Sequence, residues 1–293
     1  MVLIKSVEAR SILSKSNLPV GDYSANPYVG CTHACKYCYA SFMKRFTGHS
    51  EEWGAFLDVK NWPALKKVEK YAGREILIGS VTDPYLPQEE HYGRTRLLLE
   101  QLQGSGAKLS LITKSDLVER DLDLLSTFPG VTVAWSINTL QEDFRADMDC
   151  AASIERRLKA MEHFHKAGLR TVCFISPIFP GITEVEEIIS RVRGICVEVW
   201  LENLNLRGHS RGVILAYIRR KYPHLVSLYR EIYGRGDKTY WVDLDLSLAQ
   251  WAARQGLTYV TKRTNWQGPT QEGSPTIFNY FYHELIKKCG IRN

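Results

Sequence analysis

The chain has 293 residues, of which 44% are hydrophobic, and a formal net charge of +6. This length allows one sizeable core, as in α/β barrels, and no apolar stretch approaches the ~20 residues of a membrane span. The N-terminal residues lack the basic-then-apolar layout of a signal peptide, and seven cysteines, three of them clustered, do not form a disulfide framework. We therefore expect a cytoplasmic protein with no membrane association.

The first two thirds of the chain alternate short apolar runs with amphipathic segments. Such runs suit buried parallel strands, and the segments between them have helical periodicity. The predicted strands are 26–30, 75–80, 108–113, 131–136, 170–175 and 196–201. The predicted helices are 62–72, 94–103, 119–127, 153–167 and one that begins with a Thr183–Glu186 capping box. This alternation predicts parallel β/α units with right-handed crossovers.

The first of these strands leads into three closely spaced cysteines. Cys31, Cys35 and Cys38 have the spacing C-x3-C-x2-C. A four-iron cube needs four thiolates, so three would leave one iron open for another ligand. The alternative is a structural zinc site, which needs four ligands and would have to recruit His33 or a distant cysteine. The other four cysteines are isolated: Cys150, Cys173, Cys196 and Cys289.

Polar side chains follow three of the other predicted strands. Ser80, Thr82 and Asp83 follow the second strand, Lys114 follows the third, and Ser136 and Asn138 end the fourth. In β/α barrels the functional loops follow the C-terminal ends of the strands. Because the cysteines also follow a strand, we expect all these groups to outline one pocket, in which Lys114 suits a carboxylate. Turn capping by Thr82 and Asp83 and a surface position for Lys114 are the alternatives.

The C-terminal part of the chain is basic and aromatic. Residues 207–293 hold 14 Lys or Arg and 6 Asp or Glu, a net charge of +8, against −2 for the remainder. Arg219–Lys221 lies beside Tyr217 and Tyr222, and Lys262–Arg263 follows Tyr259. Bases stack on aromatic rings while Lys and Arg contact phosphates, so nucleic acid is a candidate partner. The alternative is that the aromatic residues pack helix faces, and Phe278, Phe281 and Leu285 have such a spacing.

The cysteine spacing resembles that of the radical S-adenosylmethionine (SAM) superfamily. The resemblance implies a partial (β/α)6 TIM-type barrel, an α/β fold, over residues 1–206, with 207–293 as a C-terminal extension packed on this core. It also implies a [4Fe–4S] cluster held by Cys31, Cys35 and Cys38, whose open iron chelates SAM. An electron from a flavodoxin or ferredoxin-type reductant then releases a 5′-deoxyadenosyl radical that abstracts hydrogen from a substrate. Tyr37 matches the aromatic position that lies against the adenine.

Further motifs are similar to the subfamily related to spore photoproduct lyase, often labelled "DNA repair photolyase". They are the cysteine loop, residues 82–89, Thr113–Lys114 and 136–138. By this resemblance Lys114 and Ser136 hold SAM, and Thr82–Asp83 takes the place of the motif that contacts the SAM amino group. Ser80 stands nearest to the lyase cysteine that returns a hydrogen atom to the product, and a serine O–H bond is too strong for that role.

Residues 207–210 look like the group called radical SAM mobile pair protein B, whose members are paired with a second radical SAM protein. The favoured function is therefore a radical SAM enzyme whose substrate the sequence does not name. The first alternative is nucleic-acid repair or modification of the spore photoproduct lyase kind. The second is a non-enzymatic metal-binding module that serves a partner protein.

Overall fold

The computed structural model describes residues 2–18, 21–261 and 274–281. The chain divides into two compact units, one formed by residues 1–135 and 149–171 and the other by 136–148 and 172–293. The division passes through the end of strand β8 (Val131–Ser136) and the start of strand β9 (Arg170–Ile178). The boundary expected at residue 206 stays a prediction.

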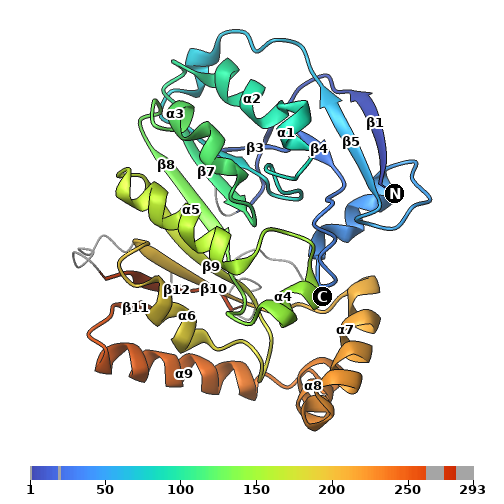
Figure 1. Ribbon diagram of the computed structural model, residues 1–293, viewed down its shortest axis with the longest axis vertical. Coiled ribbons are helices and arrows are strands. Elements are labelled where there is room, and N and C mark those ends of the chain that lie inside the picture. The colour runs from blue at the N-terminus through green and yellow to red at the C-terminus, as the bar shows by residue number, and fades with distance from the viewer. Residues whose placement is uncertain (1, 19–20, 262–273, 282–293) are drawn as a thin grey trace. The chain divides into compact units, whose positions relative to one another are not determined.

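The first unit contains a mainly parallel sheet and a smaller sheet (Figure 1). In the larger sheet β6 pairs in parallel with β3 and β7, β7 pairs in parallel with β8, and β2 pairs antiparallel with β3. In the smaller sheet β5 pairs in parallel with β1 and antiparallel with β4. The strands besides β8 are β1 (Leu3–Glu8), β2 (Leu13–Lys15), β3 (Tyr23–Ala25), β4 (Tyr28–Val29), β5 (Phe56–Asn61), β6 (Glu75–Ile78) and β7 (Lys108–Thr113).

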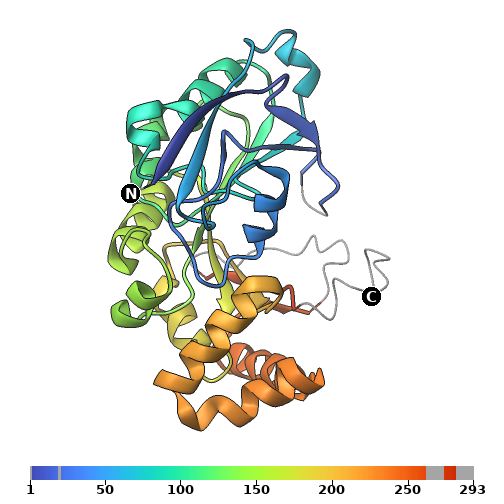
Figure 2. The same cartoon turned by 90° about the vertical axis from the view of Figure 1, so that its right-hand side faces the viewer.

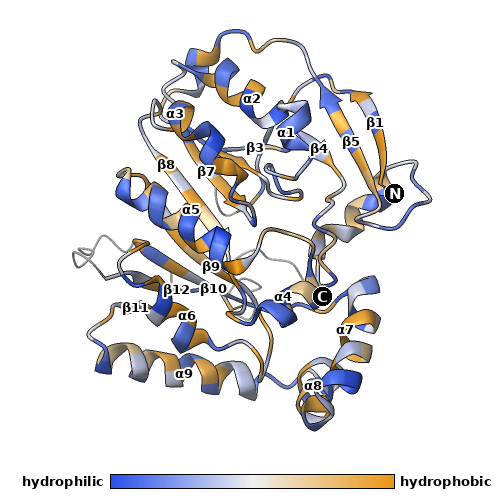
Figure 3. Ribbon diagram, in the orientation of Figure 1, coloured by the Kyte–Doolittle hydropathy of each residue, from blue (hydrophilic) through white to orange (hydrophobic). Residues whose placement is uncertain are grey.

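Four helices of this unit connect parallel strands: α1 and α2 lie between β6 and β7, and η3 and α3 lie between β7 and β8. The helices of the unit are η1 (Tyr39–Phe46), η2 (Val68–Tyr71), α1 (Glu89–Tyr92), α2 (Arg94–Leu102), η3 (Leu117–Asp121), α3 (Leu122–Leu125) and α5 (Ile154–Lys166). Helix α5 begins after Ser153, whose hydroxyl accepts the Arg156 amide at 3.4 Å and so caps the helix. In Figure 3 α5 carries both hydrophobic and hydrophilic residues, which agrees with its buried stripe of Ile154, Leu158 and Met161.

The second unit contains a fully parallel set of strands. Strand β10 (Glu198–Asn203) pairs with β9 and with β12 (Thr276–Asn279), which pairs with β11 (Tyr259–Val260). The helices of this unit, of which α7 to α9 are orange in Figure 2, are α4 (Glu142–Met148), α6 (Val185–Val192), α7 (Gly208–Lys221), η4 (Pro223–Leu225), α8 (Val226–Tyr229), the π-helical η5 (Arg230–Arg235) and α9 (Thr239–Arg254).

The α/β class with mostly parallel strands is confirmed, and the series of six predicted strands corresponds to β3, β6, β7, β8, β9 and β10. The first strand differs in position. Residues 26–30 do not form one strand. Pro27 has no N–H to donate to a neighbouring strand, and the side-chain amide of Asn26 donates to Ser80 Oγ at 2.9 Å. Instead β3 precedes Asn26 and pairs with β6, and β4 follows Pro27 in the smaller sheet.

Two further predictions about helices were wrong. Residues 62–67 are not helical, because the Trp62 indole and the Leu65 amide both donate to Gln101 Oε1, at 3.0 and 3.3 Å. The Thr183 capping box is absent, since the Thr183 hydroxyl donates to Asn138 O at 2.9 Å and accepts the Phe179 amide at 2.9 Å.

The aromatic residues of the C-terminal part are mostly packing residues. Phe278 lies in strand β12 rather than on a helix, and Leu285 and Lys262–Arg263 lie outside the described residues. Tyr217 is buried, contacts the rings of Phe144 and Tyr222, and donates to Asp147 Oδ2 at 2.8 Å. Within the described ranges, no helix is long and apolar enough to cross a bilayer.

Replacement of the Ser153 cap tests the helix that follows it. Ser153→Ala removes the acceptor of the Arg156 amide, and we expect the free energy of unfolding to fall by about 1 kcal/mol. Urea titration of the full chain gives this value. The control is Ser190→Ala in α6, whose hydroxyl donates only to the Glu186 carbonyl within the helix and whose loss we expect to change stability by less than about 0.5 kcal/mol. Equal effects of the two substitutions would contradict the assignment of Ser153 as a cap.

Candidate iron–sulfur and SAM site

The three cysteines lie in an irregular loop between β4 and η1, and all three thiols are free. Cys31 is buried, whereas Cys35 and Cys38 are half-buried. Two successive turns shape the loop, because the Ala34 amide donates to Cys31 O and the Cys38 amide donates to Cys35 O, both at 3.1 Å. The two turns place the three cysteines within one short, irregular segment.

The loop enters and leaves through close backbone contacts. Gly30 has a φ of +88°, and a Cβ atom there would lie 2.4 Å from the Phe56 carbonyl oxygen. Gly54 has a φ of +104°, and its Cβ would lie 2.7 Å from Ala34 Cβ. Glycine is therefore required at both positions for steric as well as conformational reasons.

N–H groups influence two of the three thiols. They belong to Asp83 and His33 at Cys31 and to Ala40 and Trp53 at Cys38, and they act to lower the thiol pKa against the larger effect of burial, which raises it. Donor groups beside cysteine sulfur are a recognised determinant of iron–sulfur reduction potential. The donor set therefore fits a cluster that the three thiolates would hold.

The thiols lie within electrostatic reach of one another. Burial, followed by the charges of Asp83 and Cys38, raises the pKa of Cys31 to about 12. Burial also raises the pKa of Cys35 well above its usual value, the charges of Cys31 and Cys38 add to this, and the Lys114 charge opposes it. Metal binding to such thiols has to release their protons.

The zinc alternative needed His33 as a fourth ligand. The His33 side chain is 2% exposed, and its Nε2 lies 3.1 Å from Asp83 Oδ2, so this nitrogen faces a carboxylate. In the described part of the chain, no three His, Cys, Asp or Glu side chains are grouped closely enough to hold a single metal ion.

Tyr37 is buried against a charged pair. Its hydroxyl donates to Asp149 Oδ2 at 3.2 Å, and Arg157 Nη2 donates to Asp149 Oδ1 at 3.0 Å, with both charged side chains 0% exposed. The Cys150 amide donates to His33 O at 2.8 Å, so the segment after Asp149 also holds the loop through its backbone. Lys114 Nζ lies 5.8 Å from the centre of the Tyr37 ring. The predicted contact of Tyr37 with adenine stays a prediction.

The turn after β6 lies directly against the cysteine loop. The Thr82 hydroxyl donates to Gly30 O, and Ser80 Oγ accepts a hydrogen bond from the side-chain amide of Asn26. Burial raises the pKa of Asp83, but His33 and the amides of Tyr85 and Lys114 lower it more, so that the pKa falls to about 2. The structure thus brings Ser80, Thr82, Asp83 and Lys114 to the cysteine loop within one unit.

Ser136 and Asn138 belong to the second unit, where both are buried. The Ile137 amide between them donates to Phe174 O at 2.9 Å, and the Asn138 side-chain nitrogen has no hydrogen-bond partner among the described residues. Their place in a pocket with the cysteines stays a prediction.

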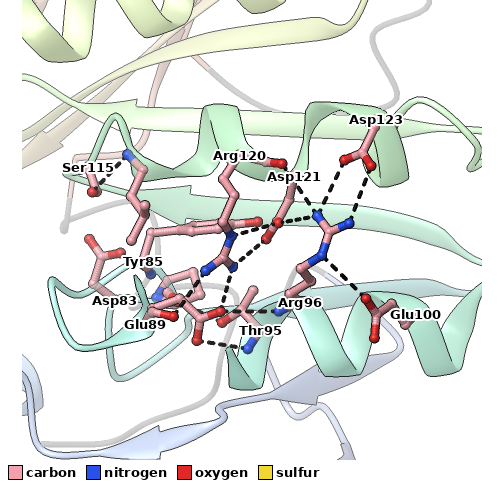
Figure 4. Close-up of polar contacts among 12 residues, drawn as sticks. Asp83, Tyr85, Glu89, Thr95, Arg96, Glu100, Ser115, Arg120, Asp121 and Asp123 are labelled. Atoms are coloured by element: carbon pink, nitrogen blue, oxygen red, sulfur yellow. Dashed lines mark hydrogen bonds and ion pairs between the residues drawn. The ribbon is translucent and has the colours of Figure 1, made fainter. Parts of the chain in front are cut away.

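A network of buried charged side chains stabilises the segments that carry this site (Figure 4). The Glu89 and Asp121 carboxylates are both 0% exposed, and Arg120 Nη2 lies 2.7 Å from the first and 2.8 Å from the second. Arg96 Nη1 reaches Asp121 at 2.9 Å, and the Tyr28 hydroxyl donates to Glu89. Tyr28 precedes the cysteine loop and Glu89 follows the Asp83 turn, so the network links the two segments that carry the site.

The sequence reasoning missed these buried charges, although one of them left a signal. Arg157 falls between Ile154, Leu158 and Met161 on the buried stripe of α5. A charged residue is almost never fully buried unless it is paired, so Arg157 at that position predicts a buried acid. Glu89 and Asp121 follow no such stripe, and nothing local in the sequence distinguishes them from surface acids.

Comparison with known proteins agrees with this geometry. The family model described as the Radical SAM superfamily matches residues 25–192. An uncharacterized protein of Methanocaldococcus jannaschii is 34% identical over 222 residues, which cover 75% of this chain and 84% of that protein. The Radical SAM Nα-GlyT isomerase of Pseudomonas phage M6 is 22% identical over 266 residues, covering 85% of this chain and 55% of the isomerase.

Two solved structures share the fold. Spore photoproduct lyase with a dinucleoside spore photoproduct gives a TM-score of 0.54 at 17% identity, covering 75% of this chain and 66% of the lyase. Streptococcus suis SuiB bound to S-adenosylmethionine gives a TM-score of 0.55 at 12% identity, covering 100% of this chain and 54% of SuiB. The α/β fold of this chain is therefore the fold of radical SAM enzymes.

A methyl group at Gly30 tests whether the loop depends on this backbone contact. Gly30→Ala places a Cβ atom against the Phe56 carbonyl at a positive φ, and we expect a loss of about 2 kcal/mol or more in the free energy of unfolding. Gly48→Ala is the control, because nothing lies within 4 Å of that Cβ. Urea unfolding and iron content after reconstitution measure both variants. Wild-type iron content and stability in Gly30→Ala would contradict the predicted role.

Removal of the buried arginine tests the pair behind Tyr37. Arg157→Met leaves the Asp149 carboxylate buried without its cation, and we expect unfolding to become easier by about 3–5 kcal/mol. The control is Lys159→Ala in the same helix, whose pair with Glu155 is exposed and contributes less than about 1 kcal/mol. Thermal and urea unfolding compare the two, and a similar small effect of both would show that Asp149 does not depend on Arg157.

Proposed function

Because the chain belongs to the radical SAM superfamily, we propose that it cleaves S-adenosylmethionine reductively at a [4Fe–4S] cluster held by Cys31, Cys35 and Cys38. When bound, this pair of cofactors supplies one-electron cleavage of SAM to methionine and a 5′-deoxyadenosyl radical, which takes a hydrogen atom from the substrate. Family membership and the enzymes among its relatives identify the chain as an enzyme, so the alternative of a non-enzymatic module is set aside.

The observation that carries the proposal is the set of three free thiols in one loop. N–H groups beside Cys31 and Cys38 oppose the effect of burial on the pKa of these thiols, and so favour the thiolate form that binds metal. The loop lies inside the residue range that matches the family model. Three thiolates leave one coordination position of a four-iron cube for SAM.

Lys114 is the side chain best suited to the SAM carboxylate. Its ammonium lies beside the Tyr37 ring and lowers the pKa of Cys35, so its charge is directed toward the cysteine loop. Ser136 and Asn138 are proposed to complete the SAM site, with the unpartnered Asn138 amide as a donor to ligand oxygen atoms. The electron is proposed to come from a flavodoxin or ferredoxin-type reductant, and a second radical SAM protein is a proposed partner.

Nucleic-acid repair or modification is the second candidate function. It is supported by the fold shared with spore photoproduct lyase and by the exposed Arg219, Arg220 and Lys221 at the end of α7. Ser80 argues against photoproduct repair, because the position nearest to the lyase cysteine carries a hydroxyl. A UV-crosslinked dinucleotide assay tests this candidate, and absence of turnover by an enzyme that cleaves SAM would remove it.

The first experiment is an anaerobic SAM-cleavage assay. The full chain is reconstituted with iron and sulfide, reduced with dithionite and assayed for 5′-deoxyadenosine. We expect product from the wild type and a loss of more than about 100-fold in Cys35→Ala. The matched control is Cys150→Ala, which removes an exposed thiol outside the loop and should retain activity. A wild type that holds the cluster yet yields no 5′-deoxyadenosine with SAM and candidate substrates would overturn the proposal.

A further inference from the structure

Both oxygens of the Asp83 carboxylate are engaged within the protein. Oδ1 accepts the Tyr85 amide at 2.9 Å and the Thr113 hydroxyl at 2.7 Å. Oδ2 accepts the Lys114 amide at 2.7 Å and lies 3.1 Å from His33 Nε2. The side chain is 7% exposed. A carboxylate has about four acceptor sites; here three hydrogen bonds are made, and the His33 ring lies against Oδ2 as an ion-pair contact without hydrogen-bond geometry.

This arrangement differs from the role that the family resemblance implies for Asp83. A SAM ammonium bound by Asp83 would have to displace one of these partners, and each of them is itself held by the fold. Thr113 ends β7, and its hydroxyl also accepts the Ser115 amide at 3.0 Å. His33 lies inside the cysteine loop, where its carbonyl accepts the Cys150 amide. Both oxygens of Asp83 thus already have partners within the protein.

The same residue joins three parts of the proposed site. Its carboxylate contacts the side chain of His33, which lies between two of the cysteines, and also accepts the amide of Lys114. Lys114 in turn carries its ammonium toward Tyr37. The side chain of Asp83 therefore links the cysteine loop to the end of β7.

We propose that Asp83 is a positioning residue, which fixes the cysteine loop through His33 and the Lys114 backbone at a set spacing and does not bind the SAM amino group. This inference rests on the proposed function, which identifies the two ligands of the site as the [4Fe–4S] cluster and SAM. The link itself, from loop to strand end, is a property of the chain without any cofactor. Its effects should therefore appear before SAM is added.

The test compares Asp83→Asn with two other variants of the full chain. Asp83→Asn keeps the shape of the side chain and exchanges one acceptor for a donor, which faces the donors of its partners. Thr113→Val removes a single hydroxyl from the same carboxylate. Asp116→Asn is the matched control, since Asp116 lies two residues beyond Lys114 and pairs with Arg156 at the surface of the unit. Thermal unfolding establishes that each variant is folded.

The first readout needs no cluster. Amide hydrogen exchange of the metal-free proteins is followed in peptides covering 31–38 and 108–115. We expect exchange in both peptides to become about tenfold faster in Asp83→Asn and several-fold faster in Thr113→Val, with no change in Asp116→Asn. Exchange that stays at the wild-type rate in both peptides of Asp83→Asn would overturn the link.

The second readout separates positioning from SAM binding. The electron paramagnetic resonance spectrum of the reduced cluster is recorded without SAM, along with the rate of iron loss to a chelator. Positioning predicts an altered spectrum and faster iron loss, by about tenfold, in Asp83→Asn. A spectrum and iron loss like the wild type, with a defect confined to a raised KM for SAM, would show that Asp83 is a direct ligand. If the wild type binds no cluster, the proposed function fails while the exchange data still decide the link.

Discussion

The cysteine loop has no regular secondary structure between β4 and η1, so contacts from outside must fix its shape. Two of these contacts come from buried carboxylates. Asp83 contacts the loop through His33, and Asp149 contacts it through Tyr37. The two carboxylates come from turns far apart in the chain, one after β6 and one after α4. The geometry of the three thiols thus depends on charges that must remain buried and paired.

Buried carboxylates are unfavourable unless their hydrogen bonds and charges are satisfied. Here backbone amides, the Thr113 hydroxyl and Arg157 satisfy them. In the same way, Arg120 pairs with the buried carboxylates of Glu89 and Asp121, and Arg96 also pairs with Asp121. A pair of this kind adds little net stability, but loss of one partner is costly because the other charge stays buried. Such pairs therefore hold one arrangement of their segments and penalise others, which is what a preorganised loop needs.

The way these polar groups are used limits which residues remain for ligands. Asp83 and Thr82 bond to the protein itself, whereas the Asn138 side-chain nitrogen has no hydrogen-bond partner among the described residues. Ser80 bonds to Asn26 and so helps to hold the turn. Neighbouring residues of one sequence motif can therefore differ in whether the protein already uses their polar atoms.

The sequence by itself determined the α/β class, the three thiols and the family, because apolar periodicity and cysteine spacing are local patterns that survive in one dimension. It also placed α2, α5 and the strands from β6 to β8 within a few residues. Other features depended on partners distant in the chain. Gln101 holds the non-helical segment 62–67, and β10 pairs with β12. The interruption of the first predicted strand at Pro27 is a further example. Only the tertiary structure decided that both oxygens of Asp83 have partners and that Arg157 meets Asp149, because hydrogen-bond partners brought together across the fold leave no spacing in the sequence.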